Sequence, residues 1–222
     1  MLSTEQLSKA YEHQQVLRDV NFSIQKGESA AIVGPSGTGK TTFLNIVGTL
    51  DVPDSGRVLF KGEDISKLNE QQRTQFRNRH IGFVFQMHHL LPQCTVLENV
   101  LIPTLTISDK NARTALRKRA SELLELVGMA AHSNKLPGQL SGGECQRTAF
   151  ARALIHQPEL ILADEPTGSL DEESAEVLTN ELLQLNNELN TTLIVVTHSL
   201  QLAGRLDSMW QLHQHQLIKN SL

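Results

Sequence analysis

A glycine-rich segment at residues 34–41 has the composition and spacing of a phosphate-binding loop. Its pattern is G-x-x-x-x-G-K-[ST], in which the glycines let successive backbone N–H groups wrap an anionic phosphate. The following helix start adds a favourable dipole, the lysine can reach β- and γ-phosphates, and the last hydroxyl can ligate Mg²⁺. A chance glycine-rich turn is the alternative, and the strand and helix expected on either side argue against it. The segment consists of Gly34, Pro35, Ser36, Gly37, Thr38, Gly39, Lys40 and Thr41, followed by Thr42.

Two adjacent carboxylates, Asp164 and Glu165, follow an apolar run at residues 160–163. Because side chains alternate between the faces of an extended strand, we expect the two carboxylates to do different work. Asp164 is predicted to hold Mg²⁺, directly or through water, and Glu165 to orient and polarise an attacking water. An acidic pair at a strand end is more often a solvated turn, so this prediction depends on the phosphate loop upstream.

A second glycine-containing segment at residues 140–144 opens a predicted helix. A serine cap followed by two glycines offers another set of N–H groups that could face a phosphate. The chain has no second lysine-bearing loop, so we do not expect a second nucleotide. We predict instead a head-to-tail dimer in which this segment closes over the nucleotide of the partner copy, and a simple helix cap is the alternative. The predicted contact residues are Ser141, Gly142, Gly143 and Glu144.

Alternating strand and helix patterns surround these segments. Apolar runs predict strands at residues 29–33, 58–60, 81–85, 160–163 and 193–196, and short alternating patches predict strands before residue 25. Helices are predicted at residues 41–50 and 172–189, the second with Ala175, Leu178, Leu182, Leu185 and Leu189 on one side. Strands that alternate with helices around a phosphate loop predict an α/β fold with a mostly parallel sheet.

The stretch from residue 87 to 158 is predicted to be helical. Thr95 and Glu98 form a capping box, and a longer helix follows Ser108 and stops at Gly128. We therefore predict one domain over residues 1–222, with a core subdomain of residues 1–86 and 159–222 and an inserted helical subdomain of about 87–158.

Composition limits the function classes. The 222 residues carry 20 Lys and Arg against 24 Asp and Glu, a net charge of -4, without the basic run that nucleic-acid binding needs. Two cysteines, Cys94 and Cys145, cannot form a disulfide framework. No apolar run approaches the roughly 18 residues of a membrane-spanning helix. The first five residues have no basic start or hydrophobic stretch, so we expect no signal peptide.

The LSGGE segment together with the phosphate loop resembles the nucleotide-binding subunit of ATP-binding cassette (ABC) transporters, over essentially the whole chain. The resemblance implies an ABC ATPase fold, that is, a phosphate-loop NTPase with N-terminal antiparallel β-strands and an inserted helical subdomain. It also implies ATP and Mg²⁺ as ligands. Cys145 departs from the polar residue usual after LSGGE, which raises the question of thiol reactivity.

The same resemblance implies roles for residues outside the two loops. Tyr11 stands where the family stacks an aromatic ring on adenine, Gln86 where it contacts Mg²⁺ and water, and Asp171 where it crosses the dimer interface. His198 matches the histidine that contacts the γ-phosphate. Taken alone, each has a structural alternative as a half-buried sheet residue, a solvated strand end or a loop residue. The resemblance implies that the catalytic residues are Lys40, Gln86, Glu165 and His198, and that the metal ligands are Thr41, Gln86 and Asp164.

Residues 48–56, 82–92 and 97–100 are most similar to the lipoprotein-releasing and macrolide-export group of ABC ATPases. Cell-division and peptide-export ATPases share parts of them. The resemblance implies a separate integral membrane permease that the chain drives from the cytoplasmic face of the cell (inner) membrane, by ATP-dependent closure of a homodimer. We hypothesise that Leu90, Leu91 and Val96 contribute both to the helical subdomain's own core and to a groove for a cytoplasmic helix of that permease.

Other function classes fit less well. A soluble ABC ATPase of DNA repair, chromosome maintenance or translation needs coiled-coil arms or tandem cassettes, and no sustained heptad insert separates Lys40 from Asp164. A GTPase leaves LSGGE unexplained and would want an Asn-Lys-x-Asp element, which the sequence lacks.

Overall fold

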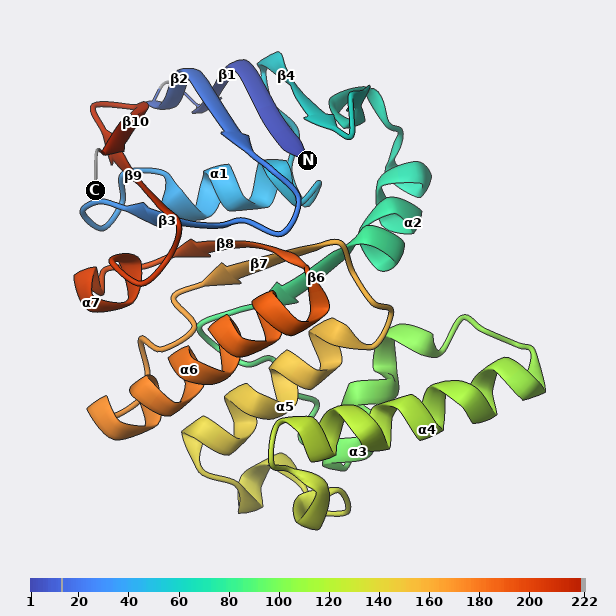
Figure 1. The fold of residues 1–222 in the computed structure, drawn as a ribbon. Coiled ribbons are helices and arrows are strands. Elements are labelled where there is room, and N and C mark those ends of the chain that lie inside the picture. Colours follow the sequence, from blue (N-terminus) through green and yellow to red (C-terminus); the bar gives the residue numbers. More distant parts are fainter. Residues whose placement is uncertain (13, 221–222) are drawn as a thin grey trace.

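The computed structural model of the chain describes residues 1–12 and 14–220 (Figure 1). In chain order the strands and helices are β1 (Leu2–Tyr11), β2 (Gln14–Ile24), β3 (Ser29–Val33), α1 (Lys40–Val47), β4 (Ser55–Phe60), β5 (Glu63–Asp64), α2 (Glu70–His80), β6 (Ile81–Val84), α3 (Val96–Leu101), α4 (Lys110–Leu126), α5 (Gly142–Leu154), β7 (Leu160–Asp164), α6 (Glu172–Leu189), β8 (Thr192–Val196), α7 (Leu200–Ala203), β9 (Ser208–His213) and β10 (Gln216–Asn220). Short 3₁₀ turns occur at Ile65–Lys67, Ile102–Thr104, Ala130–His132 and Pro137–Gln139.

Two sheets form the framework. The larger sheet has the strand order β10-β9-β3-β8-β7-β6, and all neighbouring pairs are parallel except β9 with β10. The smaller sheet, β2-β1-β4-β5, is antiparallel. Every residue of β3 and β8 is buried, as expected for central strands covered on both faces. The prediction of an α/β fold with a mostly parallel sheet and antiparallel N-terminal strands is confirmed.

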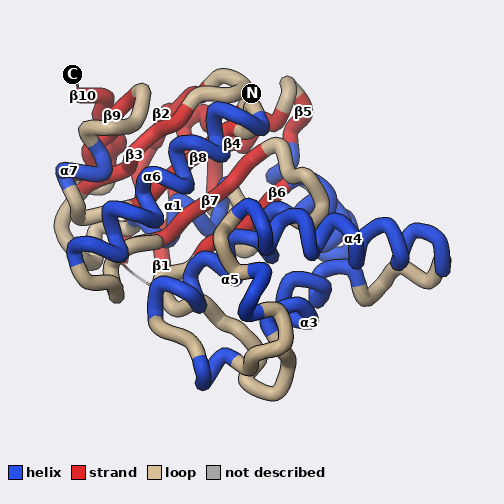
Figure 2. The backbone as a smooth tube through the Cα atoms, turned by 60° about the horizontal axis from the view of Figure 1, so that its bottom comes forward, coloured by secondary structure: helices blue, strands red, loops and turns tan. Residues whose placement is uncertain are grey.

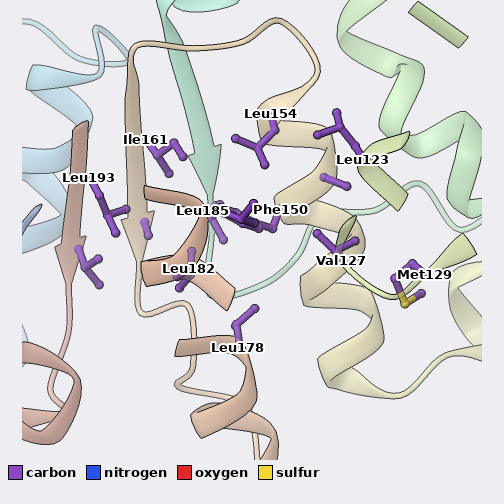
Figure 3. Close-up of a cluster of buried hydrophobic side chains, with 14 of the residues drawn as sticks. Leu123, Val127, Met129, Phe150, Leu154, Ile161, Leu178, Leu182, Leu185 and Leu193 are labelled. Carbon is purple, nitrogen blue, oxygen red and sulfur yellow. The ribbon is translucent and has the colours of Figure 1, made fainter. Parts of the chain in front are cut away.

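The larger sheet separates two hydrophobic clusters. Helix α1 and the smaller sheet lie on one face, and α3, α4, α5 and α6 lie on the other (Figure 1). Successive residues of β3 alternate between the clusters, with Ala30 and Ile32 in the first and Ala31 and Val33 in the second. In the second cluster the fully buried Phe150 of α5 meets side chains of α6 (Figure 3). Burying a side chain of this size stabilises the fold by about 1.5–3 kcal/mol.

Between β6 and β7 the chain is mainly helical. Figure 2 shows α3, α4 and α5 grouped at one end of the molecule, away from β10. The capping box at Thr95 forms as predicted: its hydroxyl accepts from the Glu98 N–H, and the Glu98 carboxylate accepts from the Thr95 N–H. Gly128 follows α4 with a φ of +67°, which suits the predicted helix stop. Across the described residues, the structure contains no helix that is both long and apolar enough to cross a membrane.

Several predicted boundaries differ from the structure. The helix expected to reach residue 50 ends at Val47, because Gly48 caps it and Thr49 leaves the helical region with a φ of +59°. The strand expected to end at residue 85 ends at Val84. Helix α6 has its predicted bounds, but Leu189 is 43% exposed rather than on the buried side, because the last turn borders a surface groove instead of the sheet.

Candidate nucleotide-binding site

The phosphate loop connects the end of β3 to the start of α1. Gly37 and Gly39 have φ values of +78° and +106°, a region that glycine adopts without strain. At Gly39 a Cβ would also lie 2.5 Å from the Val16 side chain, so a larger residue would not fit. Lys40, only 6% exposed, curls back under the loop and donates from Nζ to the carbonyls of Gly34 at 2.8 Å and Pro35 at 3.0 Å. The loop thus places a buried ammonium beneath a set of backbone N–H groups.

The ends of β7 and β8 bring acidic and imidazole groups to this ammonium. Burial lowers the pKa of Lys40, and the nearby charges of Glu165 and Asp164 act in the opposite direction. His198, which follows β8, lies with Nε2 3.3 Å from the Lys40 Nζ and 3.4 Å from the Ser36 hydroxyl. The predicted γ-phosphate contact therefore faces the phosphate loop.

Asp164, the last residue of β7, faces the first turn of α1. The Thr41 hydroxyl donates to its Oδ2 at 2.9 Å, and its Oδ1 is buried with no hydrogen-bond partner among the described residues. Burial raises the pKa of Asp164, although Thr41 and Lys40 oppose this shift. A buried carboxylate oxygen without a partner, beside a hydroxyl, is a donor set that fits a hard cation such as Mg²⁺.

Glu165 does not continue the strand. Its φ is +45°, and its N–H donates to the Val196 carbonyl at 2.8 Å. Its Oε2 accepts from the His198 backbone N–H at 3.1 Å, and its Oε1 lies 3.2 Å from His198 Nε2 without the angle of a hydrogen bond. The alternation of an extended strand is therefore not what separates the two carboxylates. The chain turns after Asp164, and both carboxylates border the same site.

The LSGGE segment forms the start of α5 as predicted. The Ser141 hydroxyl accepts from the Glu144 N–H at 3.3 Å, and the Glu144 carboxylate accepts from the Ser141 N–H at 2.7 Å. This backbone bond lowers the pKa of Glu144. His132 adds a contact from its Nδ1 to Glu144 Oε1 at 3.0 Å. The Glu144 side chain thus holds the shape of its own loop.

Glycines of this segment pack beside the start of α6. A Cβ on Gly142 would lie 3.5 Å from Leu170, and one on Gly143 would lie 3.6 Å from Ser174. Asp171 caps α6 by accepting from the Ser174 N–H at 2.9 Å and from its hydroxyl at 2.7 Å. The structure therefore groups the LSGGE segment with Asp171. These residues lie at helices on the opposite face of the sheet from α1.

Two further predicted residues lie at the edges. The Gln86 side chain, just past β6, lies against Gly168, where a Cβ would come within 3.3 Å of its Nε2. Tyr11 is 45% exposed at the end of β1, and its hydroxyl donates to Asp51 Oδ2 at 2.5 Å. Burial raises the pKa of Tyr11, and the nearby Thr42 hydroxyl opposes this shift. The structure brings together Lys40, Thr41, Asp164, Glu165 and His198, whereas Tyr11 lies on β1 and Thr42 in the first turn of α1.

Lys9, Asp51 and His132 are site neighbours that the sequence interpretation missed. The i, i+2 spacing of Lys9 and Tyr11 on a predicted strand was the one signal for the first, since it places both side chains on the same face. Nothing local indicates that Asp51 or His132 contacts a residue so distant in the sequence.

The predicted permease-facing trio is corrected in part. Val96 is fully buried and Leu90 is 7% exposed, so both belong to the helical region's own core, while Leu91 is 41% exposed. A groove of about 460 Å³ lies between α2, β6, the 3₁₀ turn after α3 and α5, with Phe83, Phe85 and Ile102 among its lining residues.

Burial raises the pKa of the Cys145 thiol, which makes it less reactive than an ordinary cysteine.

Comparison with known proteins places these features in a family. A family model described as ABC transporter matches residues 17–168. The chain is 49% identical to the lipoprotein-releasing system ATP-binding protein LolD 1 of Rhodopirellula baltica, covering 99% of this chain and 96% of the relative. It is 45% identical to LolD of Legionella pneumophila, with coverages of 98% and 96%.

Solved structures agree. The dimeric structure of MJ0796, a bacterial ABC transporter cassette, matches with a TM-score of 0.87 and 38% identity, covering 98% of this chain and 96% of that one. A dimeric post-hydrolysis state of the same cassette, bound to ADP and Pi, matches with a TM-score of 0.89 and 37% identity, covering 100% and 99%. With this full-length likeness added to its phosphate loop, half-buried carboxylates and LSGGE helix start, the chain belongs to the ABC transporter family as one of its ATP-hydrolysing cassettes.

Proposed function

We propose that this ATPase powers a separate membrane permease that releases lipoproteins from the membrane. The observation that carries the proposal is the 44–49% identity over nearly the full length to relatives named lipoprotein-releasing ATP-binding proteins. Export of a macrolide or peptide by a related permease is the second candidate, supported by the sequence similarities at residues 82–92. The chain would act at the cytoplasmic face of the cell membrane, held there by the permease.

In the proposed reaction, the phosphate loop binds the triphosphate and Lys40 balances its β- and γ-phosphate charge. Thr41, Asp164 and Gln86 would hold Mg²⁺, which supplies further positive charge at the phosphate oxygens. Glu165 accepts a proton from the water, whose oxygen bonds to the γ-phosphorus as the bond from that phosphorus to ADP breaks, and the neighbouring His198 contacts the γ-phosphate. Support for these roles comes from the Glu165 to His198 contact of 3.1 Å and the partnerless oxygen of Asp164.

The proposed active unit is a head-to-tail pair of chains. Ser141, Gly142 and Gly143 of one copy would offer N–H groups to the γ-phosphate bound by the other, with Asp171 at the interface and Glu144 shaping the segment. The core of residues 1–86 and 159–222 and the helical region of about 87–158 would act as two subdomains. The groove lined by Phe83, Phe85 and Ile102 is the proposed docking surface for a cytoplasmic helix of the permease, together with the adjoining groove that shares Ile102 and is lined by the exposed Leu91.

A mixing experiment tests the shared site. Lys40→Ala removes the phosphate-loop ammonium and Ser141→Arg blocks the LSGGE segment, so each homodimer should be inactive. Mixed dimers contain one intact composite site, because the phosphate loop of the Ser141→Arg chain would face the LSGGE segment of the Lys40→Ala chain. ATPase activity should return to about a quarter of the parent value in an equal mixture. Mixtures as inactive as the separate variants would contradict the shared site.

Reconstitution tests the transport role. The chain would be assembled with a candidate lipoprotein-releasing permease in vesicles that contain a lipoprotein. ATP should release the lipoprotein in soluble form, and Leu91→Asp, which remains folded because Leu91 is on the surface, should weaken the association with the permease. Vesicles that retain the lipoprotein but transport a macrolide or peptide would select the second candidate.

A further inference from the structure

A charge cluster built around the buried Lys9 lies next to Tyr11. Lys9, two residues earlier on β1, is only 7% exposed, and its Nζ lies 3.1 Å from Asp51 Oδ1, 2.8 Å from the Val52 carbonyl and 3.6 Å from Asp54 Oδ1. Lysine is rarely buried to this extent unless it is paired. Although burial on its own would lower it, the bonds to Asp51 and the Asp54 charge hold the pKa of Lys9 above its usual range.

Asp51 joins this ammonium to the tyrosine. One of its oxygens accepts from Lys9 and the other accepts from the Tyr11 hydroxyl at 2.5 Å. The Val52 N–H also donates to Asp51 at 2.7 Å. Burial alone would raise the pKa of Asp51, yet the bonds from Tyr11, Val52 and Lys9 hold it below the usual range. The carboxylate is therefore ionised at neutral pH and makes charge-assisted bonds on both sides.

The Tyr11 ring is fixed by two contacts at different atoms. Its hydroxyl is tethered to Asp51, and the Lys9 Nζ lies 5.1 Å from the ring centroid, within the range of a cation–π contact. A ring with a cation over one face keeps the other for a ligand, and Tyr11 remains 45% exposed.

The tether also relates the ring to the phosphate loop. Asp51 lies four residues past the end of α1, and its N–H donates to the Asn45 carbonyl of that helix at 3.2 Å. The same loop also bonds to β1: the Ala10 N–H donates to Asp54 Oδ2 at 2.6 Å, and the Asp54 N–H donates to the Ser8 carbonyl at 3.0 Å. The loop after α1 is thus bonded to β1 at several points, so the ring has a set place relative to the helix that begins at the phosphate loop.

We propose that Asp51 and Lys9 are positioning residues for nucleotide recognition, which orient the Tyr11 ring as a stacking surface for the nucleobase. This inference rests on the proposed nucleotide site and on the role of Tyr11 as the base contact, which the resemblance to ABC ATPases implies. Among the described residues, the side chains of Asp51 and Lys9 bond to each other, to Tyr11, Val52 and Asp54, and not to residues of the phosphate loop. Their effect is on the base alone, because a ring without its tether must be ordered at the moment of binding, which costs conformational entropy.

The test compares ATP with inorganic tripolyphosphate, which has no base, by calorimetric titration of the full-length chain. Tyr11→Ala should weaken ATP binding about tenfold, the size typical of lost aromatic stacking on a base. Tyr11→Phe and Asp51→Ala should each weaken ATP binding about three- to fivefold, as expected for the loss of the hydrogen bond between Tyr11 and Asp51. The double variant Tyr11→Phe with Asp51→Ala should be little weaker than either single variant, since both remove the same bond. Asp51→Asn, which keeps an oxygen for the Tyr11 hydroxyl, should recover part of the loss.

Two comparisons keep the inference separate from general damage and from the proposed function. Tripolyphosphate affinity should stay unchanged in all these variants and should fall only in Lys40→Ala. Glu5→Gln, which removes a carboxylate on β1 that is paired with Arg57 of β4, should change the affinity for neither ligand. If Tyr11→Ala weakens ATP while Tyr11→Phe and Asp51→Ala do not, or if tripolyphosphate weakens equally, the positioning role is wrong. If Lys40→Ala has no effect on either ligand, the proposed nucleotide site itself is wrong.

Discussion

Replacing Glu165 by glutamine separates the catalytic role of this carboxylate from its structural role. Its Oε2 accepts the His198 backbone N–H at 3.1 Å, and a glutamine oxygen in the same place still accepts that bond. The structural loss is then the charge assistance of one hydrogen bond, about 1–2 kcal/mol. The catalytic loss is larger, because an amide does not take a proton from water. Loss of a general base costs about 10²–10⁴ in rate, or about 3–5 kcal/mol of transition-state stabilisation.

The assay is steady-state ATP hydrolysis at saturating ATP, with thermal melting and size-exclusion chromatography on the same samples. Glu165→Gln should melt within a few degrees of the parent protein, hydrolyse ATP at least about a hundredfold more slowly and elute as a dimer when ATP is present. Glu125→Gln, an exposed carboxylate on α4, is the matched control and should change none of the three measurements. A folded Glu165→Gln variant that keeps more than about a tenth of the parent rate would refute the base assignment.

Three further outcomes follow from packing and protonation. Gly82→Ala should lower the free energy of unfolding by about 1–3 kcal/mol in denaturant titrations, because its Cβ would lie 2.6 Å from a backbone oxygen of α5, whereas Gly138→Ala, with open space, should not. The pKa of Asp51 is lower in the folded chain than its ordinary value of 3.8, so Asp51 stabilises the fold fully above pH 3.8 and loses this effect as the pH falls below it. Asp51→Asn should therefore weaken the fall in melting temperature at acidic pH. A thiol reagent should label Cys94 in the native protein and the buried Cys145 only after unfolding, as peptide mapping would reveal.

Features that depend on close neighbours were predictable from the sequence. The α6 bounds match because Asp171 caps the helix and the apolar spacing of Leu178, Leu182 and Leu185 is regular. The capping box at Thr95 and the phosphate loop are equally local, since each is a pattern of a few adjacent residues. Short-range periodicity and capping chemistry carry this information within a single stretch of chain.

Features that depend on contacts between distant residues were not predictable from the sequence. The sequence does not reveal that Glu165 adopts a φ of +45°, because what holds it there is the Val196 carbonyl and the His198 N–H from the neighbouring strand end. Likewise, Val96 and Leu91 are equivalent apolar residues until α4 and α5 cover the first and leave the second at the surface. The bond between Tyr11 and Asp51 spans 40 positions that carry no mark of it.

The arrangement of the two helix starts supports the proposal that two copies of the chain share each site. Helix α1 follows β3 and helix α5 precedes β7, and a helix packed between parallel strands runs antiparallel to them. Both helix starts therefore lie at the same edge of the sheet, where Lys40 and Ser141 stand. They lie on opposite faces, however, with the fully covered strands β3 and β8 between their hydrophobic clusters. Closing one over the other would require breaking the sheet, whereas a second copy in the proposed head-to-tail orientation would bring its Ser141 to the Lys40 loop without that change.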